Sequence, residues 1–128
     1  MIKEMKNYEI MDAATKMNAA FAENNSSQLL PMRMSFFIQR NRKTLNDIVE
    51  NINTCKNQII QKFGTPSSED SKIYTFEGDA EEKANKEFSD LMNIKIDVDL
   101  HLIKFSDIDD SVQISNEQMD AILFMIEE

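Results

Sequence analysis

The chain has 128 residues, of which 41% are apolar and 29% are charged, and its formal net charge is −9. This length and composition correspond to one globular domain, 1–128, rather than to a disordered chain. The longest apolar run, 121–126, is too short to span a membrane, and the first ten residues contain no signal-peptide segment. Because the single cysteine excludes an internal disulfide framework, we expect a cytoplasmic protein.

The charge is divided unevenly between the two halves of the chain. Residues 1–63 carry nine Lys or Arg and six Asp or Glu, a net of +3, whereas residues 64–128 carry five and seventeen, a net of −12. An acidic protein repels the phosphates of nucleic acid, which disfavours direct binding to DNA. Such a surface suits a basic protein partner or simple solubility.

Three short helices are predicted from apolar residues that recur on one face. They span about 8–23, about 79–92 and about 116–127, and Ser115 and Gln118 form a capping-box pattern at the start of the third. The apolar faces comprise Ile10, Ala14, Met17 and Phe21 in the first helix, Ala80, Ala84, Phe88 and Leu91 in the second, and Met119, Ile122, Leu123 and Ile126 in the third.

A much longer helix is predicted at 34–63. Its apolar seam repeats every four and three residues, as in a coiled coil, and consists of Met34, Ile38, Asn41, Leu45, Ile48, Ile52, Cys55 and Ile59. Asn41 is the only polar member, and such a residue often fixes register or partner choice. Cys55 is expected to be a small core residue. An extended segment at 31–36 is an alternative for the first residues, because apolar residues alternate there too.

One strand is predicted at 94–103, where apolar and polar residues alternate. The core-facing set is Ile94, Ile96, Val98, Leu100 and Leu102, and the outward set is Lys95, Asp97, Asp99 and His101. The strand needs a partner for its backbone groups, and the candidates are 72–76, 31–36 or a second chain. We expect its apolar face to pack on the long helix, and we expect 65–79 to be a loop with room for a small hairpin.

The predicted fold class is α+β and mainly α, with a long central helix packed by shorter helices and a small β element around 94–103. At 1.5 Å per residue the long helix measures about 45 Å, which neither neighbouring helix covers alone. Its seam is buried either by these helices within one chain or by a second copy in a homodimer.

The row formed by Asp97, Asp99 and His101 has the residue types of a metal site. Zinc sites use several His and Cys residues, whereas this chain has one of each. A calcium loop starting at Asp107 would need Gly at its sixth position and Glu at its twelfth, where the chain has Val and Gln. The sequence also lacks a glycine-rich phosphate loop and a nucleophile elbow. We therefore predict a solvated strand face in a protein that is not an enzyme, with no catalytic residue, no metal and no cofactor.

The segment 33–43, RMSFFIQRNRK, concentrates Arg33, Arg40, Arg42 and Lys43 beside two phenylalanines. Basic residues interleaved with aromatic ones are typical of surfaces that bind nucleic acid. In a chain of net charge −9, we instead expect these cations to pair with the protein's own acidic half.

Three stretches carry a resemblance: LLPMRMSFFIQRNRKTLNDIVENI at 29–52, IKIDVDLHLIKFSDI at 94–108 and ISNEQMDAILFMIEE at 114–128. They resemble a family of small uncharacterised proteins encoded by phages and prophages of Gram-positive bacteria. The order of the predicted elements also resembles that family, except at 64–79. The resemblance implies a phage accessory role in the host cytoplasm and supplies no reaction and no cofactor.

Among the possible functions, we favour binding to another protein without catalysis. Most concretely, the chain is expected to inhibit a host defence enzyme that targets nucleic acid, as anti-CRISPR proteins do, with acidic residues that imitate phosphates. The expected contacts are Glu77, Asp79, Glu81, Glu82, Asp97, Asp99, Asp107, Asp109 and Asp110. The alternative is a factor of virion or tail assembly, which the seam and the unpaired strand allow. A metal-dependent enzyme that uses the strand row is a minor alternative.

Overall fold

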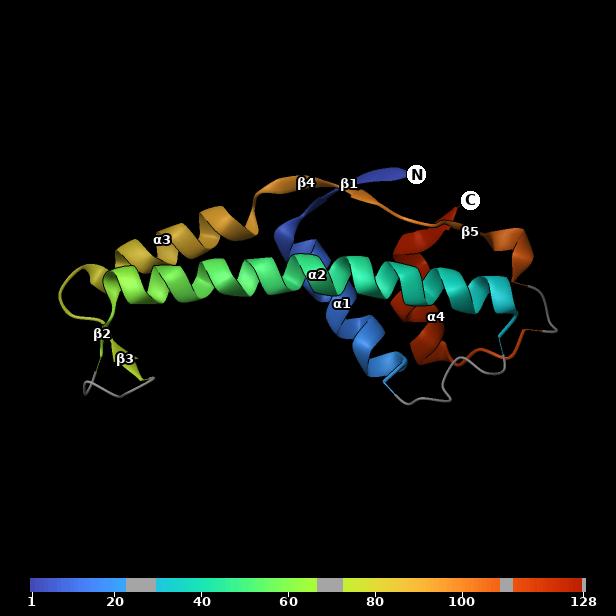
Figure 1. The fold of residues 1–128 in the computed structure, drawn as a ribbon, viewed down its shortest axis with the longest axis horizontal. Coiled ribbons are helices and arrows are strands. Elements are labelled where there is room, and N and C mark those ends of the chain that lie inside the picture. Colours follow the sequence, from blue (N-terminus) through green and yellow to red (C-terminus); the bar gives the residue numbers. More distant parts are fainter. Residues whose placement is uncertain (23–29, 67–72, 109–111, 128) are drawn as a thin grey trace.

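The computed structural model describes residues 1–22, 30–66, 73–108 and 112–127. Its longest element is helix α2 (Met32–Phe63); α1 (Asn7–Ala20) and α3 (Ala80–Met92) pack against α2, and α4 (Asn116–Ile122) packs against α1 (Figure 1). The mainly helical α+β fold with a long central helix is confirmed. None of the described helices combines the length and the hydropathy that a membrane span needs.

The predicted face of α1 is buried. Ile10 and Met17 are fully enclosed, and Ala14 and Phe21 are at most 3% exposed. Figure 1 shows α1 crossing α2 near its middle, so these residues fill the centre of the molecule. The helix ends at Ala20, and the last predicted residue lies outside the described part of the chain.

The seam of α2 is buried at six of its eight positions. The extended alternative for 31–36 is wrong, because the helix already begins at Met32. Cys55 is exposed rather than buried. Cys55 lies in the second half of α2, where α3 is the neighbouring helix, and the side of α2 that is covered there includes Ile52 and Ile59 but not Cys55.

The predicted strand is β4 (Lys95–Asp99), and its partner is β1 (Ile2–Lys6) in an antiparallel pair that places Met5 opposite Ile96. The predicted partners 72–76 and 31–36 are wrong. β1 is difficult to recognise from the sequence, because its five residues, IKEMK, include only two apolar ones. Val98 and Leu100, each 1% exposed, belong to the same core cluster as the buried residues of α2, whereas Ile94, also predicted to face the core, is 49% exposed because it lies before the paired part of the strand.

The alternation ends at Leu100 instead of continuing to 103. After Leu100 the chain leaves β1, and Ile103 rather than Leu102 is buried. Ile103 begins β5 (Ile103–Lys104), which pairs in parallel with β6 (Ile126–Glu127). Residue 103, predicted as the last residue of this strand, therefore belongs to a second, separate β pair.

The last helix is shorter than predicted. Ser115 and Gln118 form the expected capping box at the start of α4, but α4 gives way to a 3₁₀ turn, η2 (Leu123–Met125), before β6. The change of helix type reorients the following side chains. Leu123, predicted to face the core, is exposed, and Met125 is buried in its place.

The outer half of α2 and the antiparallel α3 form a helical hairpin, which we call the arm (52–92). The expected small hairpin in its connection is confirmed as β2 (Thr65–Pro66) and β3 (Tyr74–Thr75). Ile52, Ile59 and Ala84 are buried in the arm but do not belong to the main core cluster. Figure 1 shows the arm extending away from the part of the molecule that holds α1, α4 and the β1–β4 pair.

Candidate functional site

The acidic residues predicted as partner contacts are exposed wherever the structure describes them, and they form two groups. Glu77, Asp79, Glu81 and Glu82 lie around the start of α3 on the arm, and Asp97, Asp99 and Asp107 lie on β4 and the 3₁₀ turn η1 (Phe105–Asp107). Asp109 and Asp110 lie outside the described residues. Figure 1 shows α3, β4 and β5 following one another along one side of α2.

Most of these carboxylates lack a cationic partner. Among the described residues, ion pairs within 4 Å reach only Asp79, from Lys83, and Asp99, from the amino group of Met1. Both pairs are solvent-exposed, and such pairs contribute little to stability. The other described members of the two groups, Glu77, Glu81, Glu82, Asp97 and Asp107, are available to a partner.

The row Asp97, Asp99 and His101 does not converge on one point. The two carboxylates belong to the exposed outer face of β4, whereas the imidazole stacks on Phe37 with 5.1 Å between ring centroids and 21° between planes. The described residues contain no group of three or more His, Cys, Asp or Glu side chains that could hold a metal ion.

Two cations of segment 33–43 are bound within the N-terminal half of the chain. The guanidinium of Arg42 donates to Asn18 Oδ1 at 3.1 Å and to the carbonyl oxygen of Phe21 at 3.0 Å. The ammonium of Lys43 pairs with Asp47, one turn further along α2, at 3.1 Å. Neither cation pairs with the acidic half, so that expectation is wrong for both.

Arg33 and Arg40 are also not paired with the acidic half. Among the described residues, no carboxylate oxygen lies within 4 Å of either guanidinium. The physical reason is position. α3, with its acids, covers the second half of α2 (Figure 1), and Asp107, which lines a pocket together with Arg33, lies more than 4 Å from the guanidinium.

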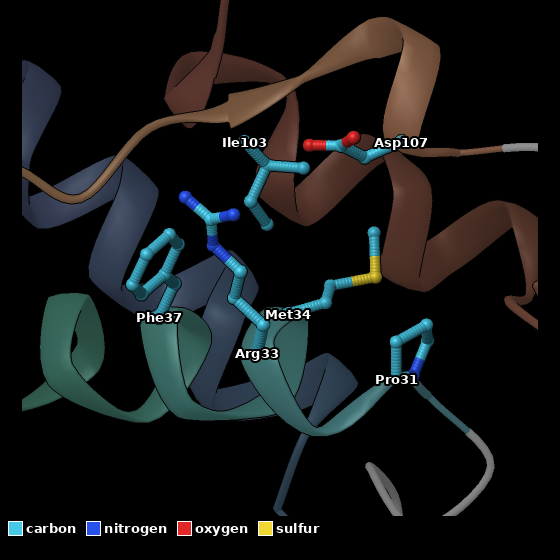
Figure 2. A pocket seen from close by; sticks show the side chains of 6 residues that line it. All are labelled: Pro31, Arg33, Met34, Phe37, Ile103 and Asp107. Carbon is cyan, nitrogen blue, oxygen red and sulfur yellow. The ribbon is translucent and has the colours of Figure 1, made fainter.

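Arg33 instead lies over the ring of Phe37, with 5.3 Å between the guanidinium carbon and the ring centroid, which is a cation–π contact. Both residues line a pocket of about 250 Å³ between the start of α2 and the β5–η1 segment (Figure 2). Its full lining is Pro31, Arg33, Met34, Phe37, Ile103 and Asp107, which we call the Phe37 pocket. The walls are mainly apolar, with one cation and one carboxylate.

Asn41 holds one side of this region in place. Its fully buried carboxamide donates from Nδ2 to the carbonyl oxygen of His101 at 2.8 Å and accepts at Oδ1 from the backbone N–H of His101 at 2.9 Å. The amide thus substitutes for a neighbouring strand just beyond β4. The sequence pattern indicated that Asn41 fixes register or partner choice, but its hydrogen-bond partner is the backbone of His101 in the same chain.

A larger, more open groove of about 680 Å³ lies between β1, α1 and α4. Its charged groups are largely satisfied within the molecule, since Lys16 pairs with Asp12 at 3.5 Å and with Asp120 at 3.8 Å. Lys3 Nζ donates to the carbonyl oxygen of Phe124 at 3.0 Å. This groove therefore offers fewer available charges than the first half of α2.

Comparison of the chain with family models, with curated proteins and with solved structures gave no match.

Proposed function

We propose that this protein is a non-catalytic, phage-type accessory protein that inhibits a host enzyme acting on nucleic acid by binding it through acidic side chains. The observation that carries the proposal is the set of exposed carboxylates without ion pairs along α3, β4 and η1. A nuclease holds DNA in a basic groove, and carboxylates that occupy this groove replace the phosphates.

The dimensions of the molecule support this proposal. The 32 residues of α2 span about 48 Å, and the segments that carry the acids follow one side of this helix (Figure 1). Residues 77–108 contain nine Asp or Glu and four Lys. Duplex DNA of the same length presents one charge per about 1.7 Å, so the protein imitates part of the phosphate pattern rather than all of it.

The alternative role in virion or tail assembly draws less support from the two features that the sequence offered for it. The seam of α2 is largely covered by helices of the same chain, and β4 is paired with β1. Neither feature therefore calls for a second copy or a structural partner.

The test is inhibition of DNA cleavage by a purified guide-RNA-directed nuclease. We expect inhibition that is competitive with DNA and that weakens as salt rises from about 0.05 M to about 0.5 M, because screening shortens the reach of the carboxylates. The triple variant Glu77→Gln/Glu81→Gln/Glu82→Gln should inhibit at least about tenfold less well, since rim charges of this kind set association rate and salt dependence.

The matched control is Asp47→Asn/Glu50→Gln/Glu117→Gln, which removes the same number of exposed carboxylates from α2 and α4. It should inhibit like the parent protein. Equal loss of inhibition in both triple variants, or inhibition that high salt leaves intact, contradicts binding through the carboxylates along α3, β4 and η1.

A further inference from the structure

A second exposed surface lies on the first half of α2, and its charge is opposite to that of the acidic residues along α3, β4 and η1. Met32 is 83% exposed and Phe36 is 56% exposed, and these side chains are four residues apart and thus neighbours on one helix face. Arg33 and Arg40, both exposed, flank them. We call these four residues the α2 strip. Single exposed apolar residues are ordinary, but an adjacent pair beside two available guanidinium groups is a contiguous amphipathic surface.

The two arginines of the strip are suited to carboxylates. Neither has a described ion pair, and Arg33 is oriented by its contact with the Phe37 ring. Guanidinium groups bind carboxylates in a bidentate manner. The seven residues from Arg33 to Arg40 correspond to about 10.5 Å along the helix, or two turns, so they match two acids spaced by two turns on another helix.

The Phe37 pocket adjoins the strip and adds a place for an apolar side chain. At about 250 Å³ it is smaller than the 300–1,000 Å³ usual for small-molecule sites, so it suits one anchoring side chain rather than a whole metabolite. Its walls are preformed, because Phe37 stacks on His101 and the backbone of His101 is fixed by Asn41. A preformed pocket lowers the ordering cost of binding.

We propose that the α2 strip and the Phe37 pocket bind an acidic amphipathic helix of another protein. One apolar side chain of that helix enters the pocket, and acids two turns apart contact Arg33 and Arg40. The charge of the surroundings favours a peptide over single-stranded nucleic acid. Asp107 lies in the pocket wall, the net charge of the chain is −9, and a helix face offers single carboxylates rather than a continuous phosphate backbone. This surface adjoins the acidic residues at Asp107, but its contacts come from Arg33, Arg40 and apolar side chains, so the proposal does not depend on the inhibitor function.

The test is a selection from a display library of helical peptides about 16 residues long, or roughly four turns. The full chain is the target, and the Arg33→Glu/Arg40→Glu variant is the counter-target. We expect enriched peptides that carry acids seven residues apart with apolar residues between them. Their affinity should fall at least about tenfold in the double variant and in Met32→Gln/Phe36→Gln, since both remove exposed contacts without touching the core.

The control variant, Lys56→Glu/Lys86→Glu, reverses two charges on the arm and should bind the peptides like the parent chain. Amide shift mapping by NMR should place the bound peptide at 31–41 and 101–107. Enrichment of no peptide, or of peptides that the double variant binds equally well, overturns the proposal. So does tighter binding of a fluorescent oligothymidine of about 20 nucleotides that is lost with Arg33→Glu/Arg40→Glu, because the surface would then be a nucleic-acid site.

Discussion

At the scale of single residues, Asn41 shows how one polar side chain can join two distant parts of a chain. Its amide makes two hydrogen bonds to the backbone of His101, and Nδ2 also lies 3.2 Å from Met125 Sδ. These contacts link α2, a residue just beyond β4 and η2 inside a core whose other buried polar side chain, among the described residues, is Asn7. A buried polar group is favourable only while its partners are present, because each lost partner leaves a desolvated group behind.

We predict that Asn41→Leu lowers the free energy of unfolding by about 1–3 kcal/mol, since the backbone N–H and C=O of His101 lose their partners. Urea denaturation followed by circular dichroism measures this change. Asn51→Leu, at an exposed position of the same helix, serves as the control and should change stability by less than about 0.5 kcal/mol. Equal effects of the two substitutions would show that the hydrogen bonds to His101 contribute nothing.

At the scale of elements, the β1–β4 pair has an unfavourable arrangement of charges on its outer face. Glu4 lies directly opposite Asp97, and Lys6 lies opposite Lys95. Like charges in opposite positions destabilise a strand pair. The diagonal contact between Lys95 and Glu4, at 3.7 Å, offsets part of this repulsion. The strand pairing therefore gives no reason for an acid at position 97, whereas the proposed contact with a partner does.

We predict that Asp97→Lys stabilises the protein by roughly 0.2–1 kcal/mol, because it converts a repulsive cross-strand pair into an attractive one. Thermal unfolding measures the gain, and Asp97→Asn should give a smaller one. In the cleavage assay the same Asp97→Lys variant should inhibit less well than the parent. A variant that is both less stable and equally inhibitory contradicts both parts of this prediction.

At the scale of the whole molecule, the arm is the part with the least buried apolar surface. Ile52, Ile59 and Ala84 are its buried apolar residues among those described, whereas the main cluster gathers side chains from α1, α2, α4 and the strands. Regions with few buried contacts open locally at lower free energy than the core. The acidic group at the start of α3 therefore lies on the more easily deformed part of the fold.

We predict that backbone amides of α3 exchange hydrogen faster than those of α1, and that Ile59→Ala increases the difference. The substitution removes packing from the arm alone, so protection in α3 should fall while protection in α1 stays close to that of the parent. Hydrogen exchange followed by mass spectrometry resolves the two helices. In the control, Ile38→Ala, protection should fall throughout the molecule, because Ile38 is fully buried in the main cluster.

The sequence was sufficient where a pattern repeats over many residues and insufficient where two short segments meet. The seam of α2 and the face of α1 follow helical spacing, which local sequence records. The partner of β4 could not be found in this way, because β1 is only five residues long and lies far from β4 in the sequence, so the pairing depends on the path of the whole chain. The same limit applies to the candidate sites, since the exposure of each acid was foreseeable but the encounter of Arg33, Phe37 and His101 was not.

The pairing of β1 with β4 has a consequence for synthesis of the chain. β1 is complete at Lys6, but its partner ends at Asp99, so the long segment between them must be synthesised before the two can meet. At elongation rates of about 5–20 residues per second, this wait lasts roughly 5–20 s. During that time α1 and α2 can form as a local helical pair, and the β1–β4 pair then closes over them as one of the last steps of folding.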